Sequence, residues 1–227
     1  MKISLSPRSR KGFTLIELII VIAILATLAG IAYPTYMSIQ TNAARTAAKK
    51  VCTDIVSAVE SFKQDNNGLM PYDSSSSEPD DKDQIHLTSI SGEDAGMIKI
   101  LTNREDDEDR RINSTRDVYL RSDEQEKPMD GLYVNDAGEV SFYDPWGKPY
   151  YITICEEDEG AIDPFTKRRY RGKNCLVYST GPDQEGVADT TTTTRKPKGK
   201  GGKPSASAAE EAEEALEDNV YSWKNQK

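Results

Sequence analysis

The chain has 227 residues, of which 30% are charged, and a formal net charge of −9 at pH 7. Such an acidic chain is poorly suited to non-specific nucleic-acid binding, because phosphate repulsion opposes the electrostatic term that drives it, and we expect no nucleic-acid partner. The 3 cysteines show no metal-binding spacing. The single histidine, His86, lies in a polar loop region without a nucleophile or metal-ligand pattern nearby and is assigned no role.

The first informative feature is an apolar run of 21 residues, 13–33, in which Glu17 is the only charge. A helix of that length rises about 30 Å, at roughly 1.5 Å per residue, and can cross the hydrocarbon core of a bilayer. The preceding residues 1–12 carry four positive charges, which hold them on the cytoplasmic face while the rest of the chain is translocated. The sequence therefore predicts one membrane-spanning helix, residues 13–34.

The position of the cleavage signal differs from that of an ordinary secretory signal. Such a signal places its cut after the apolar core, whereas here the plausible cut precedes it. Gly12 has no side chain and fits closely beside a protease backbone, so we expect cleavage between Gly12 and Phe13. Residues 1–12 would be a removed leader, and Phe13 would become a cationic amino terminus.

The segment GFTLIELIIVIAILATLAGIAYP, residues 12–34, closely resembles the class III signal of type IV pilins and type II secretion pseudopilins. This resemblance implies cleavage after Gly12 by a prepilin peptidase, N-methylation of Phe13 and packing of the helix in a filament core. It also places Gly12, Phe13 and Glu17 at the family's processing and assembly positions.

Glu17 has two interpretations that the sequence leaves open. An acid one turn into a helix can cap the free amides of its own first turn and lie near the lipid headgroups. Alternatively, because intramembrane acids usually have a partner or a task, Glu17 pairs with the Phe13 ammonium of a neighbouring subunit and brings it into register.

Beyond the membrane segment, apolar residues continue three and four apart, which predicts that the same helix extends through an amphipathic half, residues 35–64. Gly30 and Pro34 indicate a bend, because proline removes an intrahelical hydrogen bond. The amphipathic half needs a globular domain to cover its apolar stripe, which consists of Ala44, Ala47, Ala48, Val51, Cys52, Ile55, Val56, Val59 and Phe62.

The rest of the chain predicts a small α+β domain. Polar loops are expected at 73–83 and 103–111, a short helix at 95–101 and a buried connection at 118–120. Turn residues around 135–138 and 144–147 separate strands expected at 131–134, 139–143, 150–155 and 175–179. We expect one antiparallel sheet with its apolar face on the long helix, a pilin-like arrangement.

A low-complexity insertion is expected at residues 187–217, where five threonines, a Lys/Gly/Pro tract and an Ala/Glu run follow one another. Its glycine and proline content argues against a packed core, and only the Ala/Glu part favours a helix. The globular domain would then consist of residues 65–186 and 218–227, with the insertion looped out.

The second half of the chain resembles a narrower group, the major pseudopilins of type II secretion systems. Residues 62–71 fit that group's end-of-helix pattern, and DPWGKPY, residues 144–150, fits its hallmark turn. YSTGPDQEG, residues 178–186, and DNVYSW, residues 218–223, resemble the two halves of its calcium loop.

The resemblance implies a Ca²⁺ site whose ligands would be Asp183, the carbonyl of Thr180, and Asp218 or Asn219. Calcium takes six to eight oxygen ligands from a loop that can wrap the ion. About 30 low-complexity residues separate the two halves here, and an asparagine stands where the family tends to have aspartate. Loop-closure cost grows only with the logarithm of loop length, so the insertion need not break the site. The alternative is that these acids are solvated turn residues.

The cysteines allow one cross-link. Cys155 and Cys175 end one predicted strand and begin the next, so a disulfide is geometrically allowed and would suit an oxidising periplasm. Cys52 lies on the apolar stripe and is expected to be a small buried residue.

Together these features predict a structural protein and not an enzyme: a subunit of the periplasmic pseudopilus that drives export in a type II secretion system. Its expected partners are further copies in a helical filament, minor pseudopilins, the inner-membrane assembly platform and the prepilin peptidase. It would lie in the inner membrane as a single-pass protein with its domain in the periplasm. The alternatives are a type IV pilin of a surface fibre used in adhesion, motility or DNA uptake, and a monotopic enzyme or binding module on an uncleaved anchor. No phosphate loop or nucleophile triad supports the last of these.

Overall fold

The computed structural model describes residues 13–72, 84–89, 96–105, 111–156, 159–183 and 219–224. The chain divides into two units, Met1–Ala43 and Ala44–Lys227. The predicted leader, the polar loop at 73–83, the centre of the loop at 103–111 and the predicted insertion lie outside the described residues.

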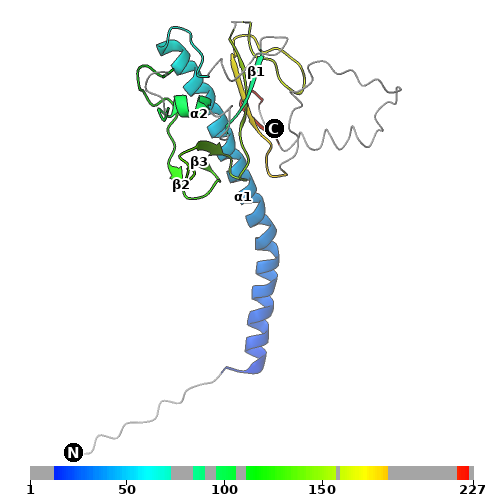
Figure 1. Cartoon of the computed structure of the whole chain (residues 1–227). Helices are drawn as coiled ribbons and strands as arrows, with labels where there is room; N and C mark the ends of the chain where they lie inside the picture. The colour runs from blue at the N-terminus through cyan, green and yellow to red at the C-terminus, as the bar shows by residue number, and fades with distance from the viewer. Residues whose placement is uncertain are drawn as a thin grey trace, which may run out of the picture. The chain divides into compact units, whose positions relative to one another are not determined.

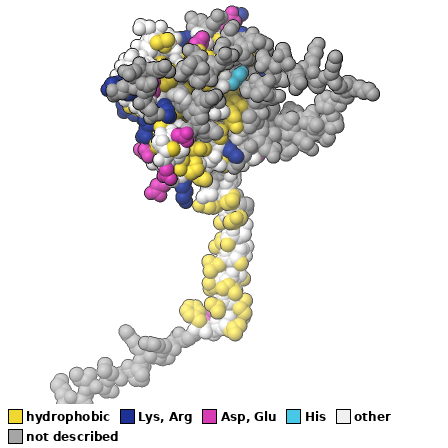
Figure 2. Space-filling model, viewed as in Figure 1, with side chains coloured by type: hydrophobic (Ala, Val, Ile, Leu, Met, Phe, Trp, Pro, Cys, Tyr) yellow, Lys and Arg dark blue, Asp and Glu magenta, His cyan; other side chains and the backbone are white. Residues whose placement is uncertain are grey.

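Helix α1, Leu15–Asp65, is a single helix of 51 residues, as the apolar periodicity predicts. It is continuous through Gly30 and Pro34, and the bend expected there stays a prediction. Figure 2 shows hydrophobic side chains along its N-terminal part, where Leu15 is 76% exposed and Ile39 61%. Within the described part of the chain, α1 is the one helix whose length and composition would let it cross a membrane.

The C-terminal end of α1 is fixed by two residues with positive φ, Asn67 at 55° and Gly68 at 88°. Glycine adopts this left-handed conformation without a side-chain clash. The amide of Gly68 then donates to the carbonyl of Lys63 at 2.8 Å, which satisfies one of the last helical carbonyls. The helix therefore ends where the sequence places the start of the domain.

Most of the predicted apolar stripe of α1 forms one side of the core of the second unit, but Ala47 is exposed and Ala44 is only partly buried. Cys52, Ile55 and Phe62 are each 0% exposed and pack against apolar residues of both sheets and of α2, Gly96–Leu101. Figure 1 shows these elements around the C-terminal part of α1. The fold is α+β, with a long helix packed on antiparallel strands in a pilin-like arrangement, as predicted.

The larger sheet has four antiparallel strands in the order β1-β5-β6-β7. These are β1, Gln84–Thr88; β5, Tyr151–Cys155; β6, Cys175–Ser179; and β7, Val220–Tyr221. The last pairing, β6 with β7, sets Tyr178 opposite Tyr221 and Ser179 opposite Val220. It brings the two ends of the chain that flank the predicted insertion side by side.

The smaller sheet was not expected as a separate layer. It consists of β2, Glu124–Gln125, parallel to β3, Gly131–Val134, which pairs antiparallel with β4, Val140–Tyr143. β4 and β5 do not continue as a hairpin, because pairing stops after a single bridge from Tyr143 to Pro149, and proline has no amide hydrogen for the ladder. The predicted single sheet is therefore wrong, although all four predicted strands are present.

Two other expectations need correction. His86 lies in strand β1, not in a loop, and its Nδ1 is 3.1 Å from the Thr153 hydroxyl of β5. Of the connection at 118–120, Leu120 is buried at 3% exposure, but Val118 is 43% exposed.

Candidate assembly and cation-binding sites

The first turn of α1 is closed by a reciprocal hydrogen-bond pair. A carboxylate oxygen of Glu17 accepts from the backbone amide of Thr14 at 2.9 Å and from its hydroxyl at 2.8 Å. The amide of Glu17 in turn donates to the Thr14 hydroxyl at 3.3 Å. This is a capping box, in which a Thr and a Glu three residues later satisfy amides that the helix leaves free. In the single chain, Glu17 therefore caps the first turn of its own helix, which is the first of the two interpretations that the sequence left open.

The two predicted processing residues lie at the N-terminal limit of the described chain. Phe13 is 86% exposed at the start of the described chain, and Gly12 lies outside the described residues. Thr14 was not singled out from the sequence, although the spacing Thr-x-x-Glu at a helix start was visible there.

A second site is the Asp144 turn, residues 144–148, between β4 and β5. One carboxylate oxygen of Asp144 accepts from the amides of Trp146 at 3.0 Å and Lys148 at 2.8 Å. The amide of Gly147, whose φ is 80°, donates to the Asp144 carbonyl at 3.0 Å. The predicted turn is therefore confirmed, and its aspartate is fully buried.

The second carboxylate oxygen of Asp144 makes a hydrogen bond outside the turn, with strand β6. It accepts from the hydroxyl of Ser179, the last residue of β6, at 2.6 Å. Burial raises the pKa of Asp144 above its ordinary value, while the bonds from Ser179 and the turn amides act in the opposite direction. The carboxylate therefore ties the β4–β5 connection to the end of β6.

The residues after Ser179 include the predicted calcium ligands. Because Ser179 lies opposite Val220 in antiparallel register, Thr180 and Asn219 lie at neighbouring strand ends. Both are buried at 1% exposure, whereas Asp183 is exposed. Asp218 lies outside the described residues, so the structure brings together two of the four predicted ligands.

The fit of these residues to calcium rests on their oxygen atoms. The hydroxyl oxygen of Thr180 is buried and makes no hydrogen bond among the described residues, which leaves an orphaned oxygen donor beside the strand ends. Hydroxyl, carbonyl and amide oxygens suit a hard cation such as Ca²⁺. Within the described ranges, no group of three or more His, Cys, Asp or Glu side chains could hold a metal ion.

A second Asp-Pro turn, at residues 163–166, resembles the Asp144 turn and was missed from the sequence. One oxygen of the buried Asp163 accepts from the amides of Phe165 at 2.9 Å and Thr166 at 3.2 Å. Its other oxygen accepts from the Trp223 indole at 3.2 Å and lies 3.8 Å from the Lys224 ammonium. This turn therefore fixes the chain just after β7, as Asp144 fixes the end of β6.

The predicted disulfide is not formed, and all three cysteines are free and buried. Cys175 lies opposite Ile154, whereas Cys155 lies opposite Gln84 of β1. The two cysteines are thus one residue out of register, and their side chains belong to different clusters, Cys175 in the main core and Cys155 in a smaller one. Because successive side chains of a strand alternate between faces, this offset separates the thiols. Cys52 is buried as predicted.

A cavity of about 720 Å³ lies beside the end of α1 and is lined by Val59, Glu60, Lys63, Gln64, Asn67, Gly68, Met70, Gly172, Asn174 and Cys175. Burial raises the pKa of the Cys175 thiol well above its ordinary value. A thiol held in its neutral form is a poor nucleophile, because the thiolate is the reactive species. This cavity therefore offers no activated cysteine.

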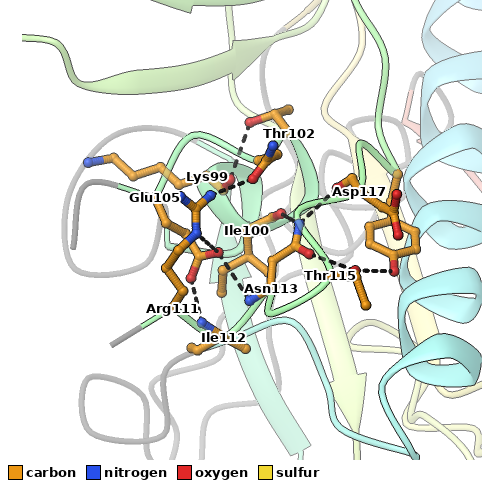
Figure 3. Close-up of polar contacts among 11 residues, drawn as sticks. Lys99, Ile100, Thr102, Glu105, Arg111, Ile112, Asn113, Thr115 and Asp117 are labelled. Carbon is orange, nitrogen blue, oxygen red and sulfur yellow. Dashed lines mark hydrogen bonds and ion pairs between the residues drawn. The ribbon is translucent and has the colours of Figure 1, made fainter. Parts of the chain in front are cut away.

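Figure 3 shows a polar network that fixes the connection after α2. The buried side-chain amide of Asn113 donates to the carbonyls of Ile100 at 3.0 Å and Asp117 at 2.8 Å. The carboxylate of Glu105 accepts from the amides of Ile112 and Asn113 at 2.7 and 3.1 Å. Each of these four bonds ends on a backbone group, so they support the α2–β2 connection.

Comparisons with known proteins bear on the N-terminal segment. Residues 7–33 match the family model described as the prokaryotic N-terminal methylation motif. The chain is 43% identical over 60 residues to the type IV wide pilus major component PilA4 of Thermus thermophilus. That match covers 26% of this chain and 46% of the relative, so the chain spans about half the length of the curated relative it matches. No solved structure matches the chain.

The motif covers the predicted cleavage site, the capping box and the apolar start of α1, and the exposed apolar helix is consistent with a single-pass membrane anchor. The N-terminal segment thus carries the prokaryotic N-terminal methylation motif, and over 60 residues the chain is similar to a type IV pilus component.

Proposed function

We propose that this protein is a structural subunit of a periplasmic pseudopilus that drives protein export in a type II secretion system. The observation that carries the proposal is the start of α1, where Glu17 is the single acid of an apolar segment that follows the predicted cleavage site and whose apolar side chains are exposed. Apolar surface of that extent needs lipid or other protein to cover it, and further copies of the same helix would do so.

Assembly would begin with processing. A prepilin peptidase removes residues 1–12, and the new Phe13 amine is N-methylated. The carboxylate of Glu17, held by Thr14 in the single chain, then pairs with the Phe13 ammonium of a neighbouring subunit. That pairing would compensate the cost of placing an acid at membrane depth. The remaining partners in this proposal are minor pseudopilins and the inner-membrane assembly platform.

A type IV pilin of a surface fibre is the second candidate function. The similarity to a type IV wide pilus component favours it, because that relative is named as a pilus subunit. Both candidates use the same processing, methylation and helix packing. They differ in whether the fibre stays in the periplasm and serves export, or extends from the cell for adhesion, motility or DNA uptake.

We also propose that Ca²⁺ binds where β6 and β7 diverge, with Asp183, Thr180, and Asp218 or Asn219 as ligands. The buried Thr180 hydroxyl, without a hydrogen-bond partner in the described chain, supports this placement. The ion would supply a positive charge that joins the two chain segments flanking the insertion. A chelator should then lower the melting temperature of the full chain in detergent, and an unchanged melting temperature would remove the metal from the proposal.

The protein would act without catalysis, from the inner membrane and with its domain in the periplasm. Deleting the gene and measuring both export and surface fibres tests the proposal. Loss of protein export with unchanged surface fibres supports the pseudopilus. Loss of surface fibres with normal export supports the type IV pilin, and normal behaviour in both assays contradicts both.

A further inference from the structure

The Ser179 hydroxyl takes part in two hydrogen bonds, one with the turn between β4 and β5 and one with the chain just after β6. It donates to the buried carboxylate of Asp144 at 2.6 Å and accepts from the amide of Gly181 at 3.1 Å. A hydroxyl has one hydrogen to donate, so the bond to Asp144 fixes that hydrogen and leaves a lone pair for Gly181.

The bond from Gly181 restrains the residue between the two bonded groups. Gly181 has a φ of 75°, so the chain turns sharply just after Thr180. With Ser179 fixed in β6 and Gly181 fixed to its hydroxyl, the carbonyl of Thr180 has little freedom to reorient. The chain then continues through Asp183, the exposed acid of this turn.

The anchor at Asp144 is stronger than an ordinary turn bond. Hydrogen bonds to an ionised group are roughly twice as strong as neutral ones, and this one is sheltered from water because both residues are 0% exposed. The turn of residues 144–148 holds the other carboxylate oxygen, so the anchor is itself fixed.

We propose that Asp144 is a positioning residue for residues 180–183, and that through Ser179 it sets the affinity of this turn for Ca²⁺. The inference rests on the calcium site proposed above. It gives the Asp-Pro-Trp-Gly turn a role beyond packing and reversal of the chain: it holds the first half of a cation loop whose second half begins across the sheet at Asn219.

The test uses the full chain in detergent micelles and compares two buried serines. Ser179→Ala removes the hydroxyl that connects the Asp144 carboxylate to the Gly181 amide. Ser89→Ala is the matched control, because Ser89 is also 0% exposed and its hydroxyl joins two segments, donating to the Phe142 carbonyl and accepting from the Tyr150 amide at 2.7 Å. Asp144→Asn is a third variant, which keeps an oxygen for the turn amides but presents an NH₂ group to Ser179.

The first readout is Ca²⁺ affinity by titration. Ser179→Ala should raise the dissociation constant at least tenfold and Asp144→Asn should raise it in the same direction, while Ser89→Ala stays within twofold of the wild type. Both serine variants should lower the melting temperature, so a general loss of stability cannot produce this difference. Equal effects of the two serine variants on affinity, or none from Ser179→Ala, would overturn the proposal.

The second readout needs no metal. In the presence of a chelator, hydrogen exchange of the Gly181 amide should be at least tenfold faster in Ser179→Ala than in the wild type and unchanged in Ser89→Ala. If the wild type binds no Ca²⁺ but Gly181 responds as expected, the calcium site fails and the affinity claim falls with it. If the wild type binds Ca²⁺ and Gly181 exchange is unchanged, the positioning role alone is refuted.

Discussion

Thr14 and Glu17 hold each other at the start of α1, with the Glu17 carboxylate 2.8 Å from the Thr14 hydroxyl and 2.9 Å from its amide. In the single chain, the only acid of the apolar run 13–33 is therefore bonded within its own helix. During assembly, Glu17 must either keep its bonds to Thr14 while it also pairs with the Phe13 ammonium of a neighbouring subunit, or lose the bonds to Thr14 when that pair forms.

Replacing Thr14 tests the cap. Thr14→Ala should weaken the first turn of α1 by about 1 kcal/mol, because the hydroxyl that serves both Glu17 groups is lost. Amide hydrogen exchange of residues 17 and 18 in micelles should become faster. Thr27→Ala is the control, since the Thr27 hydroxyl bonds to the carbonyl of Ala23 inside the helix and caps nothing. Equal exchange in both variants would contradict a capping role.

Two substitutions at Glu17 separate the cap from the charge. Glu17→Gln keeps a side chain that can complete a capping box but removes the charge, whereas Glu17→Ala removes both. If pairing with the Phe13 ammonium drives assembly, both variants should insert in the membrane and neither should form fibres. Fibre yield and membrane fractionation are the measurements. Normal fibres from Glu17→Gln would show that the cap, not the charge pair, is what assembly needs.

Phe62 tests the packing of the long helix on the domain. It is 0% exposed, and its ring meets that of Tyr119 edge-on with centroids 5.3 Å apart. Phe62→Ala should lower the free energy of unfolding by about 3–5 kcal/mol, because a buried cavity is left. Leu69→Ala, at a position 61% exposed, should change it by no more than about 0.5 kcal/mol. Denaturant unfolding in mild detergent compares the two, and similar losses would contradict the assigned core.

The raised pKa of Asp144 predicts a pH dependence of stability. Because the folded state binds this proton more tightly than the unfolded state, the contribution of Asp144 to stability falls as pH rises from its ordinary pKa, about 4, through its raised value. In the presence of a chelator, the wild type should therefore lose more free energy of unfolding from pH 4 to pH 7 than Asp144→Asn. Parallel pH profiles of the two proteins would refute the assignment.

The sequence predicts most of the fold because its long-range patterns are strong. The apolar run at the start of α1 and the three-and-four spacing of apolar residues beyond it predict the long helix, and the turns at 135–138 and 144–147 separate β3, β4 and β5. Strand β1 was missed because its five residues follow a polar segment, although Ile85 and Leu87 alternate with His86. Strand β7 was missed because 40 residues, 180–219, separate it in sequence from its partner β6.

The details of the sites depended on register, which the sequence did not determine. A shift of one residue places Cys175 opposite Ile154 and separates it from Cys155, so the disulfide that the sequence allowed is not formed in this structure. The hydrogen bond between Asp144 and Ser179 joins residues that lie 35 apart in sequence. It connects the β4–β5 turn to strand β6, and no local sequence pattern reveals such a contact. Thr14, in contrast, was recognisable from its spacing to Glu17.

The most direct test of the central claim is the intact mass of the protein isolated from its native membranes. We expect a chain that begins at an N-methylated Phe13, lacks residues 1–12 and is recovered in fibres through its apolar helix. A monomeric protein that retains Met1 would contradict it.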